Sequence, residues 1–153
     1  MRKEPINRIS VKGLRVWRIY GIIQTLIVLL LGIGTVVINY FTGNYIWLYI
    51  VAGAVVVLFG YLFIYLCAKV RWGRWRYEVR DQEIELQHGL FVVKRTLVPM
   101  VRVQHVDTEQ GPILRKYDLS SITISTAATS HTIPALITEE ADELRGRISV
   151  LAR

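Results

Sequence analysis

The sequence has 153 residues, of which 52% are apolar, and its formal net charge is +7 at pH 7. This apolar content is high for a soluble domain, and the residues outside the apolar stretches suffice for one small domain. The single cysteine, Cys67, excludes an intramolecular disulfide and a metal site built from several cysteines.

Positive charge is concentrated at two places along the chain. Residues 1–18 contain six basic residues and one acidic residue, and a second basic group lies in residues 69–76. In residues 77–153 the eleven acidic residues outnumber the nine basic ones. Because a domain that binds nucleic acid needs a basic face to neutralise phosphates, this balance argues against nucleic acid as a partner.

Residues 19–68 contain no Asp, Glu, Lys or Arg and predict a two-helix transmembrane hairpin. The apolar runs 20–41 and 45–68 each exceed the roughly 20 residues that a helix needs to cross the hydrocarbon core. A backbone in lipid must satisfy its own hydrogen bonds, so both runs are expected to be helical. The Thr-Gly-Asn triplet at 42–44 forms turns readily, and such a short joint makes the two helices antiparallel neighbours.

The flanks of this hairpin predict its orientation. Basic residues lie on both sides of it, whereas the joint at 42–44 has none. By the positive-inside rule both termini are expected in the cytoplasm, with residues 1–18 as a basic segment and residues 69–76 as a basic juxtamembrane linker. Four tryptophans are expected in the aromatic belts at the membrane interfaces. They are Trp17, Trp47, Trp72 and Trp75.

Residues within the two runs favour a structural role for them. Cys67 is expected to face lipid or the other helix, with S-acylation at the membrane boundary as the alternative. The small residues at 52–54 and Gly60 are candidates for close helix contact. Neither run contains a residue that carries charge near neutral pH, which argues against a transporter or channel.

From Trp75 onward the chain shows the alternation of apolar and polar residues that is typical of strands. Gly89 supplies the backbone freedom for a hairpin bend, and Pro112 suits the first position of a short helix that reaches Tyr117. Strands are expected over 75–80, 84–88, 90–98, 101–106 and 121–126, with a short extended piece near 131–133.

The C-terminal stretch predicts one amphipathic helix. It is expected to begin at Thr138 as the capping residue, with acidic residues in its first turn, where the helix dipole favours them. Its apolar stripe must be buried, so the helix is expected to cover an open end of the sheet. The stripe consists of Ala141, Leu144, Ile148 and Leu151. The predicted fold of residues 77–153 is therefore five to seven antiparallel strands followed by a helix.

Several short motifs, together with the layout of two spans and one domain, resemble the YdbS-like bacterial pleckstrin-homology (PH) domain family. The motifs are Tyr-Glu-Val at 77–79, His-Gly-Leu at 88–90, Val-Pro-Met-Val-Arg-Val-Gln-His-Val at 98–106, Gln-Gly-Pro-Ile-Leu-Arg at 110–115, Ile-Pro-Ala-Leu at 133–136 and Glu-Ala-Asp-Glu-Leu-Arg at 140–145. The sequence departs from the family at Asp118, where glycine is common, and at 126–129, where Thr-Ala-Gly-Gly is common.

The resemblance covers nearly the whole chain and implies several properties. The fold it implies for residues 77–153 is a PH-like split barrel closed by a C-terminal helix. It also implies a multi-pass protein of the bacterial cell membrane without established enzymatic activity. A heteromeric complex with a larger relative that carries several such domains, and a role in envelope stress or antimicrobial-peptide tolerance, are further implications of the resemblance.

No catalytic or metal-binding constellation is present in the sequence. His88, His105 and His131 lack the spacing of metal ligands and are expected to be exposed or hydrogen-bonded strand residues. Gly-rich phosphate loops, nucleophile elbows and paired carboxylates are also absent. We therefore expect no enzymatic activity, no catalytic residue, no metal and no cofactor.

Protein–protein interaction is the favoured function, as a scaffold or as a subunit of a membrane complex. A membrane anchor raises the effective concentration of the domain toward any other membrane-bound protein. The apolar stretch 90–93 and the exposed face of the C-terminal helix are predicted contact surfaces, although 90–93 could instead belong to the core. Open strand edges could accept a partner strand or a second copy of the chain.

Binding of anionic lipid headgroups is the alternative function. Acidic residues at the first hairpin turn, 81–85, would repel a phosphorylated headgroup, so the basic residues that could contact lipid lie elsewhere. Without convergence in space these residues are ordinary surface charges. The candidates are Arg71, Arg74, Arg76, Lys94, Arg95, Arg102, Arg115 and Lys116.

Overall fold

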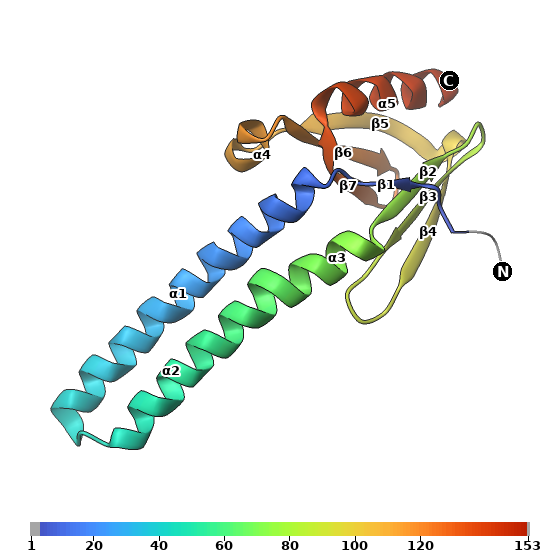
Figure 1. The fold of residues 1–153 in the computed structure, drawn as a ribbon. Coiled ribbons are helices and arrows are strands. Elements are labelled where there is room, and N and C mark those ends of the chain that lie inside the picture. The colour runs from blue at the N-terminus through green and yellow to red at the C-terminus, as the bar shows by residue number, and fades with distance from the viewer. Residues whose placement is uncertain (1–3, 153) are drawn as a thin grey trace. The chain divides into compact units, whose positions relative to one another are not determined.

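The structure is a computed structural model that describes residues 4–152 (Figure 1). It divides into a helical unit, residues 17–69, and a β-rich unit formed by the residues on either side of it. Arg2 and Lys3, which were expected to contribute to the basic N-terminal segment, and the C-terminal Arg153 lie outside the described residues.

Two long helices dominate the helical unit, and both are long and apolar enough to cross a membrane. The first, α1, covers Lys12–Thr42, and its residues up to Val16 belong to the β-rich unit. The second is continuous over Ile46–Arg74 and consists of three segments. They are α2 (Ile46–Gly60), the π-helix η1 (Tyr61–Cys67) and α3 (Ala68–Arg74). The predicted hairpin is confirmed, whereas its π-helical segment was not predicted.

Asn39 closes the turn between the two helices. Its side chain is 3% exposed, its Nδ2 donates to the carbonyl of Tyr45 at 3.0 Å, and its Oδ1 accepts from the N–H of Tyr45 at 3.1 Å. Its own carbonyl accepts from the N–H groups of Gly43 and Asn44. The side chain of Asn39 therefore satisfies the N–H of Tyr45, while the carbonyl of Tyr45 also accepts from the N–H of Leu48.

The Asn39→Leu variant is expected to open this turn. It removes two hydrogen bonds and leaves the N–H of Tyr45 without its partner, which costs about 1–3 kcal/mol, whereas the carbonyl of Tyr45 still accepts from the N–H of Leu48. Limited proteolysis of the full-length protein in detergent micelles should then show cleavage near residues 42–45 at least several-fold faster than in the wild type. Thr35→Val is the matched control, because the Thr35 hydroxyl bonds only within its helix, to Leu31. Equal cleavage rates in the two variants would show that Asn39 is not needed to close the turn between the two helices.

The two long helices approach each other closely at Gly21. A Cβ atom built on Gly21 would lie 2.9 Å from the carbonyl oxygen of Phe63, in the π-helical segment. A Cβ on Gly60 would lie 3.2 Å from Cγ2 of Thr25, so this predicted small-residue position does face the other helix. Gly53, the other glycine predicted for such contact, faces open space.

Within residues 4–152, seven strands form two antiparallel sheets in the β-rich unit (Figure 1). The first sheet has the order β1-β2-β3-β4 and contains β1 (Asn7–Arg8), β2 (Arg76–Val79), β3 (Glu83–His88) and β4 (Lys94–Pro99). The second has the order β5-β6-β7 and contains β5 (Val103–Glu109), β6 (Leu119–Thr126) and β7 (Ser130–Ile137). No strand pairing joins the two sheets within residues 4–152, so the PH-like domain is split rather than closed.

Three short or terminal helices complete the unit. They are the 3-10 helix η2 (Met100–Arg102), α4 (Pro112–Lys116) and α5 (Thr138–Leu151). Pro112 begins α4 as predicted, because its fixed φ suits the first helical position. Of the four residues of the predicted α5 stripe, Ala141 and Ile148 are fully buried, whereas Leu144 and Leu151 are partly buried.

Several details of the sequence-based prediction need correction. The strand predicted over 90–98 begins only at Lys94, and residues 90–93 form a loop in which Phe91 is 90% exposed and Val92 is 79% exposed. The alternative that this stretch belongs to the core is therefore wrong. Ile137, not Thr138, is the N-cap of α5, because the Thr138 hydroxyl is engaged by Gln110 and Ser120.

The remaining differences concern strand extent. The final strand β7 is longer than the extended piece predicted near 131–133. The short strand β1 was not predicted at all, and it pairs Asn7 with Tyr77 and Arg8 with Arg76. This pairing places part of the N-terminal segment in the same unit as the PH-like domain.

Both sheets and α5 contribute to the core of the PH-like domain. Alternation along the strands buries aliphatic side chains on the inner faces, and each fully buried side chain contributes roughly 1.5–3 kcal/mol. The fully buried members include Ile84, Leu86, Leu119, Ile122, Ile124, Ile133, Leu136 and Ile148. Val16, at the start of α1, packs with Leu119 and Ala135, so the N-terminal segment is anchored in the same core.

Candidate functional site

A groove about 600 Å³ in volume lies between β5 and α5. Its lining residues are Val103, Gln104, His105 and Val106 from β5, and Arg145, Gly146, Ser149 and Ala152 from the helix and its end. Among the described residues β5 pairs with β6 only, so its other edge is not hydrogen-bonded to a strand. Figure 1 shows α5 running along β5.

Local features keep this groove accessible. The β5–β6 register shifts between Val103 and His105, and such a bulge bends the strand and changes the direction of its side chains. On the helix side Gly146 has no side chain, and a Cβ built there would meet no atom within 4 Å. An open strand edge beside a groove can accept an extended peptide, with backbone hydrogen bonds for affinity and side-chain contacts for specificity.

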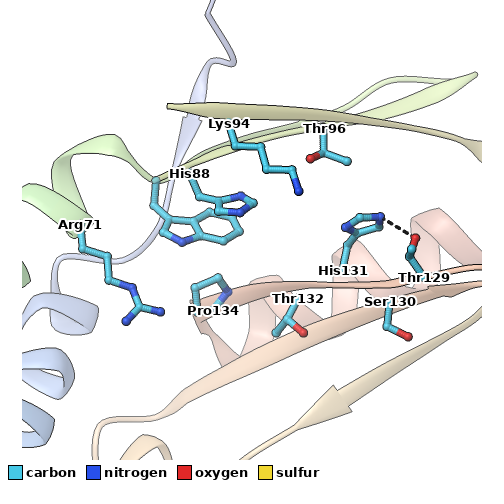
Figure 2. Close-up of a pocket in the computed structure, with 10 residues that line it drawn as sticks. Arg71, His88, Lys94, Thr96, Thr129, Ser130, His131, Thr132 and Pro134 are labelled. Carbon is cyan, nitrogen blue, oxygen red and sulfur yellow. Dashed lines mark hydrogen bonds between the residues drawn. The ribbon is translucent and has the colours of Figure 1, made fainter. Parts of the chain in front are cut away.

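A second cavity, about 510 Å³ in volume, opens between the two sheets (Figure 2). One wall comes from α3 and the β3–β4 hairpin, and the other from β7 and the residue before it. The lining residues are Arg71, Trp75, His88, Lys94, Thr96, Thr129, Ser130, His131, Thr132 and Pro134. Every lining side chain that can carry charge near neutral pH is basic, so the cavity is electropositive.

His88 is held in place in this cavity by a stacked aromatic ring. Its ring stacks on Trp75, with centroids 5.3 Å apart and planes inclined by 17°. Its Nδ1 is buried and has no hydrogen-bond partner among the described residues. Burial, followed by the positive charges of Lys94, His131 and Arg71, lowers the pKa of His88 below its ordinary value of 6.5. The opposite wall holds His131, whose Nε2 lies 3.1 Å from the Thr129 hydroxyl.

Arg71 and Lys94 are the two predicted lipid-contacting residues that the structure brings into this cavity. Arg74 instead donates to the carbonyl of Leu90 at 2.6 Å. Arg76 forms an ion pair with Glu4, and Arg95 donates to Gln87 at 2.9 Å. Arg102 lies on η2, and Arg115 and Lys116 lie on α4, all three exposed and outside the cavity lining.

The four predicted interface tryptophans have different surroundings. Trp47 is 58% exposed and Trp17 is partly buried. The indole N–H of Trp72 donates to the carbonyl of Ser10 at 3.1 Å. Trp75 is only 6% exposed, which leaves little of its ring to reach lipid.

Carboxylates surround Arg80 at the first hairpin of the PH-like domain. The guanidinium donates to Glu78 at 3.0 and 3.1 Å and to Glu83 at 3.1 Å, and it lies 3.5 Å from Glu85. The hydrogen bond from Arg80 is the main reason that the pKa of Glu78 lies below its ordinary value. Since Arg80 is already engaged by carboxylates, this hairpin is poorly suited to bind an anion.

The sequence-based prediction treated the histidines separately and missed the convergence of His88 with His131. A partial signal was available, because a hairpin bend at Gly89 places His88 near the start of the following strand. The observed register indeed pairs His88 with Lys94. Within the described residues no group of three or more His, Cys, Asp and Glu residues is placed to hold a metal ion.

Comparison with known proteins gives three findings. The sequence model of the family described as "Bacterial PH domain" matches residues 23–152. The chain is 52% identical over 153 residues to the UPF0699 transmembrane protein YdbS of Bacillus subtilis (strain 168), covering 100% of this chain and 96% of that protein. It is 30% identical over 95 residues to the UPF0699 transmembrane protein YdbT of the same strain, covering 58% of this chain and 19% of YdbT. No solved structure matches the chain significantly.

Proposed function

Because the chain belongs to the bacterial PH domain family and to the UPF0699 transmembrane proteins, we propose that it is a non-enzymatic membrane-anchored subunit that binds another membrane protein. The groove between β5 and α5 is the proposed binding surface. The observation that carries the proposal is the open edge of β5 beside a groove of about 600 Å³.

An extended segment of the partner is the proposed occupant of this groove. An added strand would pair with the free backbone groups of β5, and its side chains would lie against α5. The groove has a mixed lining, with Val103 and Val106 as apolar contacts and Arg145 and Ser149 as polar ones. Such a lining suits a peptide that presents apolar and polar side chains alternately.

The proposed partner is a longer membrane protein that contains related PH domains. YdbT supports this class of partner, because only 19% of its length aligns with the present chain, so that protein holds much more sequence than one such domain. Membrane anchoring of both proteins would raise the effective concentration of each toward the other. A second copy of this chain is the other partner that the open strand edge could accept.

The proposed topology follows the charge pattern of the flanks. Both termini lie in the cytoplasm, the spans cover about 20–41 and 45–68, and the basic linker is 69–76. The PH-like domain of residues 77–153 is then cytoplasmic, which is where it would meet the partner. A role in envelope stress or antimicrobial tolerance is an expectation that comes from the family resemblance.

The Gly146→Trp variant is expected to block partner binding. A tryptophan at this position would fill the groove, and its Cβ conflicts with no atom of the domain, so the fold should tolerate the change. Co-purification of the full-length protein from its native host in mild detergent, followed by mass spectrometry, measures the amount of bound partner. We expect at least tenfold less partner with Gly146→Trp than with wild type.

Glu143→Trp is the matched control, since it adds the same ring to an exposed position of the same helix outside the groove lining. Wild type and Glu143→Trp should both retain a stoichiometric membrane protein with related domains. The proposal fails if the wild type purifies without such a protein, or if Gly146→Trp retains as much of it as the control does.

Anionic headgroup binding is the second candidate function, and one observation favours it. The cavity of Figure 2 collects basic side chains from α3, β3, β4 and β7 and contains no acidic residue in its lining. The two candidates use different surfaces of the domain, so one does not exclude the other.

A further inference from the structure

We infer that the cavity between the two sheets is a binding site for a phosphate group, held by Lys94, His88 and His131. This inference deepens the second candidate function and is independent of the groove between β5 and α5. Figure 2 shows the ammonium group of Lys94 extending toward the space between the two histidine rings, with hydroxyl side chains on the β7 wall.

Charge is the first argument for an anion. The four lining residues with ionisable nitrogen are Arg71, His88, Lys94 and His131, and no aspartate or glutamate lines the cavity. Cations that face one another without a carboxylate repel, and a bound anion turns this repulsion into attraction.

The buried nitrogen of His88 is the second argument. Most buried polar atoms in native proteins have a hydrogen-bond partner, and each exception calls for an explanation. Nδ1 of His88 has none among the described residues, although the stack on Trp75 holds the ring in place. A ligand oxygen would supply the missing partner once the ring turns Nδ1 toward the cavity.

The arrangement of donors favours phosphate over a carboxylate. Lys94 and His88 come from the β3–β4 hairpin, while His131 and the hydroxyls of Thr129 and Ser130 come from the opposite wall. A phosphate group presents acceptor oxygens in several directions, so it can bond to both walls at once. A carboxylate has two oxygens on one side and would leave one wall without a partner. The cavity volume of about 510 Å³ also leaves room for an ester group attached to the phosphate.

Two sources could supply this phosphate group. Arg71 lies on α3, three residues after Ala68, the last residue of the second predicted span, so a phospholipid headgroup is one source. A soluble phosphate or phosphate ester is the other. The chemistry of recognition is the same for both, and the experiment separates them.

The test uses imidazole NMR of the full-length protein in maltoside micelles, which contain no phosphate. Inorganic phosphate should shift the resonances of His88 and His131 saturably, whereas His105, which lines the other groove, serves as an internal control and should not shift. Lys94→Gln should weaken binding at least fivefold. Lys116→Gln removes the same charge from an exposed site on α4 and should leave binding unchanged.

A pH titration with sulfate, which keeps its charge in this range, provides a second readout. Burial and the charges of Lys94, His131 and Arg71 lower the pKa of free His88, and a bound anion would raise it again. The pKa of His88 is therefore higher in the anion-bound protein than in the free protein. As the pH falls between these two pKa values, the affinity for the anion should rise. Below the lower pKa the affinity should no longer change. Affinity that does not change with pH would overturn the role of His88.

Lipid nanodiscs then identify the source. A shift of His88 and His131 in discs with phosphatidylglycerol, but not in phosphatidylcholine discs, assigns the site to an anionic headgroup. No shift in either disc, with the response to inorganic phosphate retained, assigns it to a soluble phosphate.

The inference is wrong if phosphate shifts neither histidine or if Lys94→Gln binds like the wild type. If charge-dependent lipid binding nevertheless persists in that case, headgroup binding stands but uses another surface.

Discussion

The Gly21→Leu variant is expected to lose about 3 kcal/mol of stability in the helix pair, at the upper end of the usual cost of overpacking a tight interface. An added Cβ would lie 2.9 Å from the carbonyl oxygen and 3.1 Å from the carbonyl carbon of Phe63, and 3.1 Å from Cα of Ile64. All three atoms belong to the backbone, so no rotation of a side chain can relieve the conflict. The two helices would have to separate along this contact.

This contact depends on the π-helical segment Tyr61–Cys67. Small residues at membrane helix interfaces allow backbones to approach, which strengthens van der Waals packing where no hydrophobic force drives association. Phe59 and Phe63, stacked at 4.2 Å between ring centroids, straddle the start of this segment. A larger residue at position 21 would remove the close approach that gives the pair its stability.

Thermal unfolding of the full-length protein in micelles measures the effect, and Gly34→Leu is the matched control. Both variants place leucine in the same helix, but a Cβ on Gly34 meets no atom within 4 Å. The midpoint of unfolding should fall clearly for Gly21→Leu and stay near the wild-type value for Gly34→Leu. Equal midpoints would show that the two helices are not held together at Gly21.

The sequence predicted the membrane hairpin because its signal is local. Length and the absence of charge decide whether a stretch can span the bilayer, and the 42–44 joint is too short for any arrangement but a hairpin. The position of the close backbone contact at Gly21 was not predictable in this way. Glycines occur in both helices, and which of them meets the other helix depends on rotation and on the π-helical turn rather than on composition.

Strand positions followed from alternation, and the errors occurred where alternation is ambiguous. The apolar run at 90–93 has high strand propensity, but it connects two strands, and Phe91, Val92 and Val93 remain exposed. The short β1 strand has no periodicity to detect and exists only because β2 is available to pair with it. Tertiary context decided both cases.

The backbone conformation of Asp118 explains why aspartate can replace the glycine that is common at this position in the family. Its φ of 54° lies in the left-handed region, which glycine adopts freely and which Asp tolerates better than most residues. The glycine that is common here in the resembling family suits the same backbone conformation. Asp118 therefore keeps the turn after α4, and its carbonyl accepts a hydrogen bond from the N–H of Thr138.

Only part of the candidate sites could be predicted from the sequence. Arg71 and Lys94 were selected for their charge, but nothing in the local sequence joins them to His131, which comes from the other sheet. The open edge of β5 was foreseeable as a general feature of split barrels, whereas the groove beside it depends on how α5 packs. Both sites form where elements distant in sequence meet, and spacing along the chain does not encode that meeting.

The Gly89→Ala variant is expected to cost the PH-like domain about 3 kcal/mol, since a strained backbone conformation alone costs about 1–3 kcal/mol and a steric conflict adds to it. The φ of Gly89 is 142°, a conformation that side chains rarely adopt. A Cβ at this position would also meet the carbonyl oxygen of Val92. The loop between β3 and β4 must therefore change its path if any side chain is added.

Urea unfolding of the full-length protein in micelles, followed through the near-ultraviolet signal of the domain, measures this loss. Gly111→Ala is the matched control, because its φ is −76° and an added Cβ meets no atom within 4 Å. The control should unfold at nearly the wild-type urea concentration, and Gly89→Ala at a clearly lower one. If both variants match the wild type, the loop is free to rearrange and Gly89 is not required for its shape.

The loop between β3 and β4 affects both the stability of the PH-like domain and the proposed phosphate site. His88 precedes Gly89, and Lys94 follows the loop and pairs with His88 across the hairpin. A changed loop path would move the two side chains apart even in molecules that remain folded. Gly89→Ala should therefore weaken phosphate binding even at urea concentrations at which the variant is still folded, whereas Gly111→Ala should not. A variant that loses stability but binds phosphate normally would show that the register of the hairpin, rather than its loop, positions these two residues.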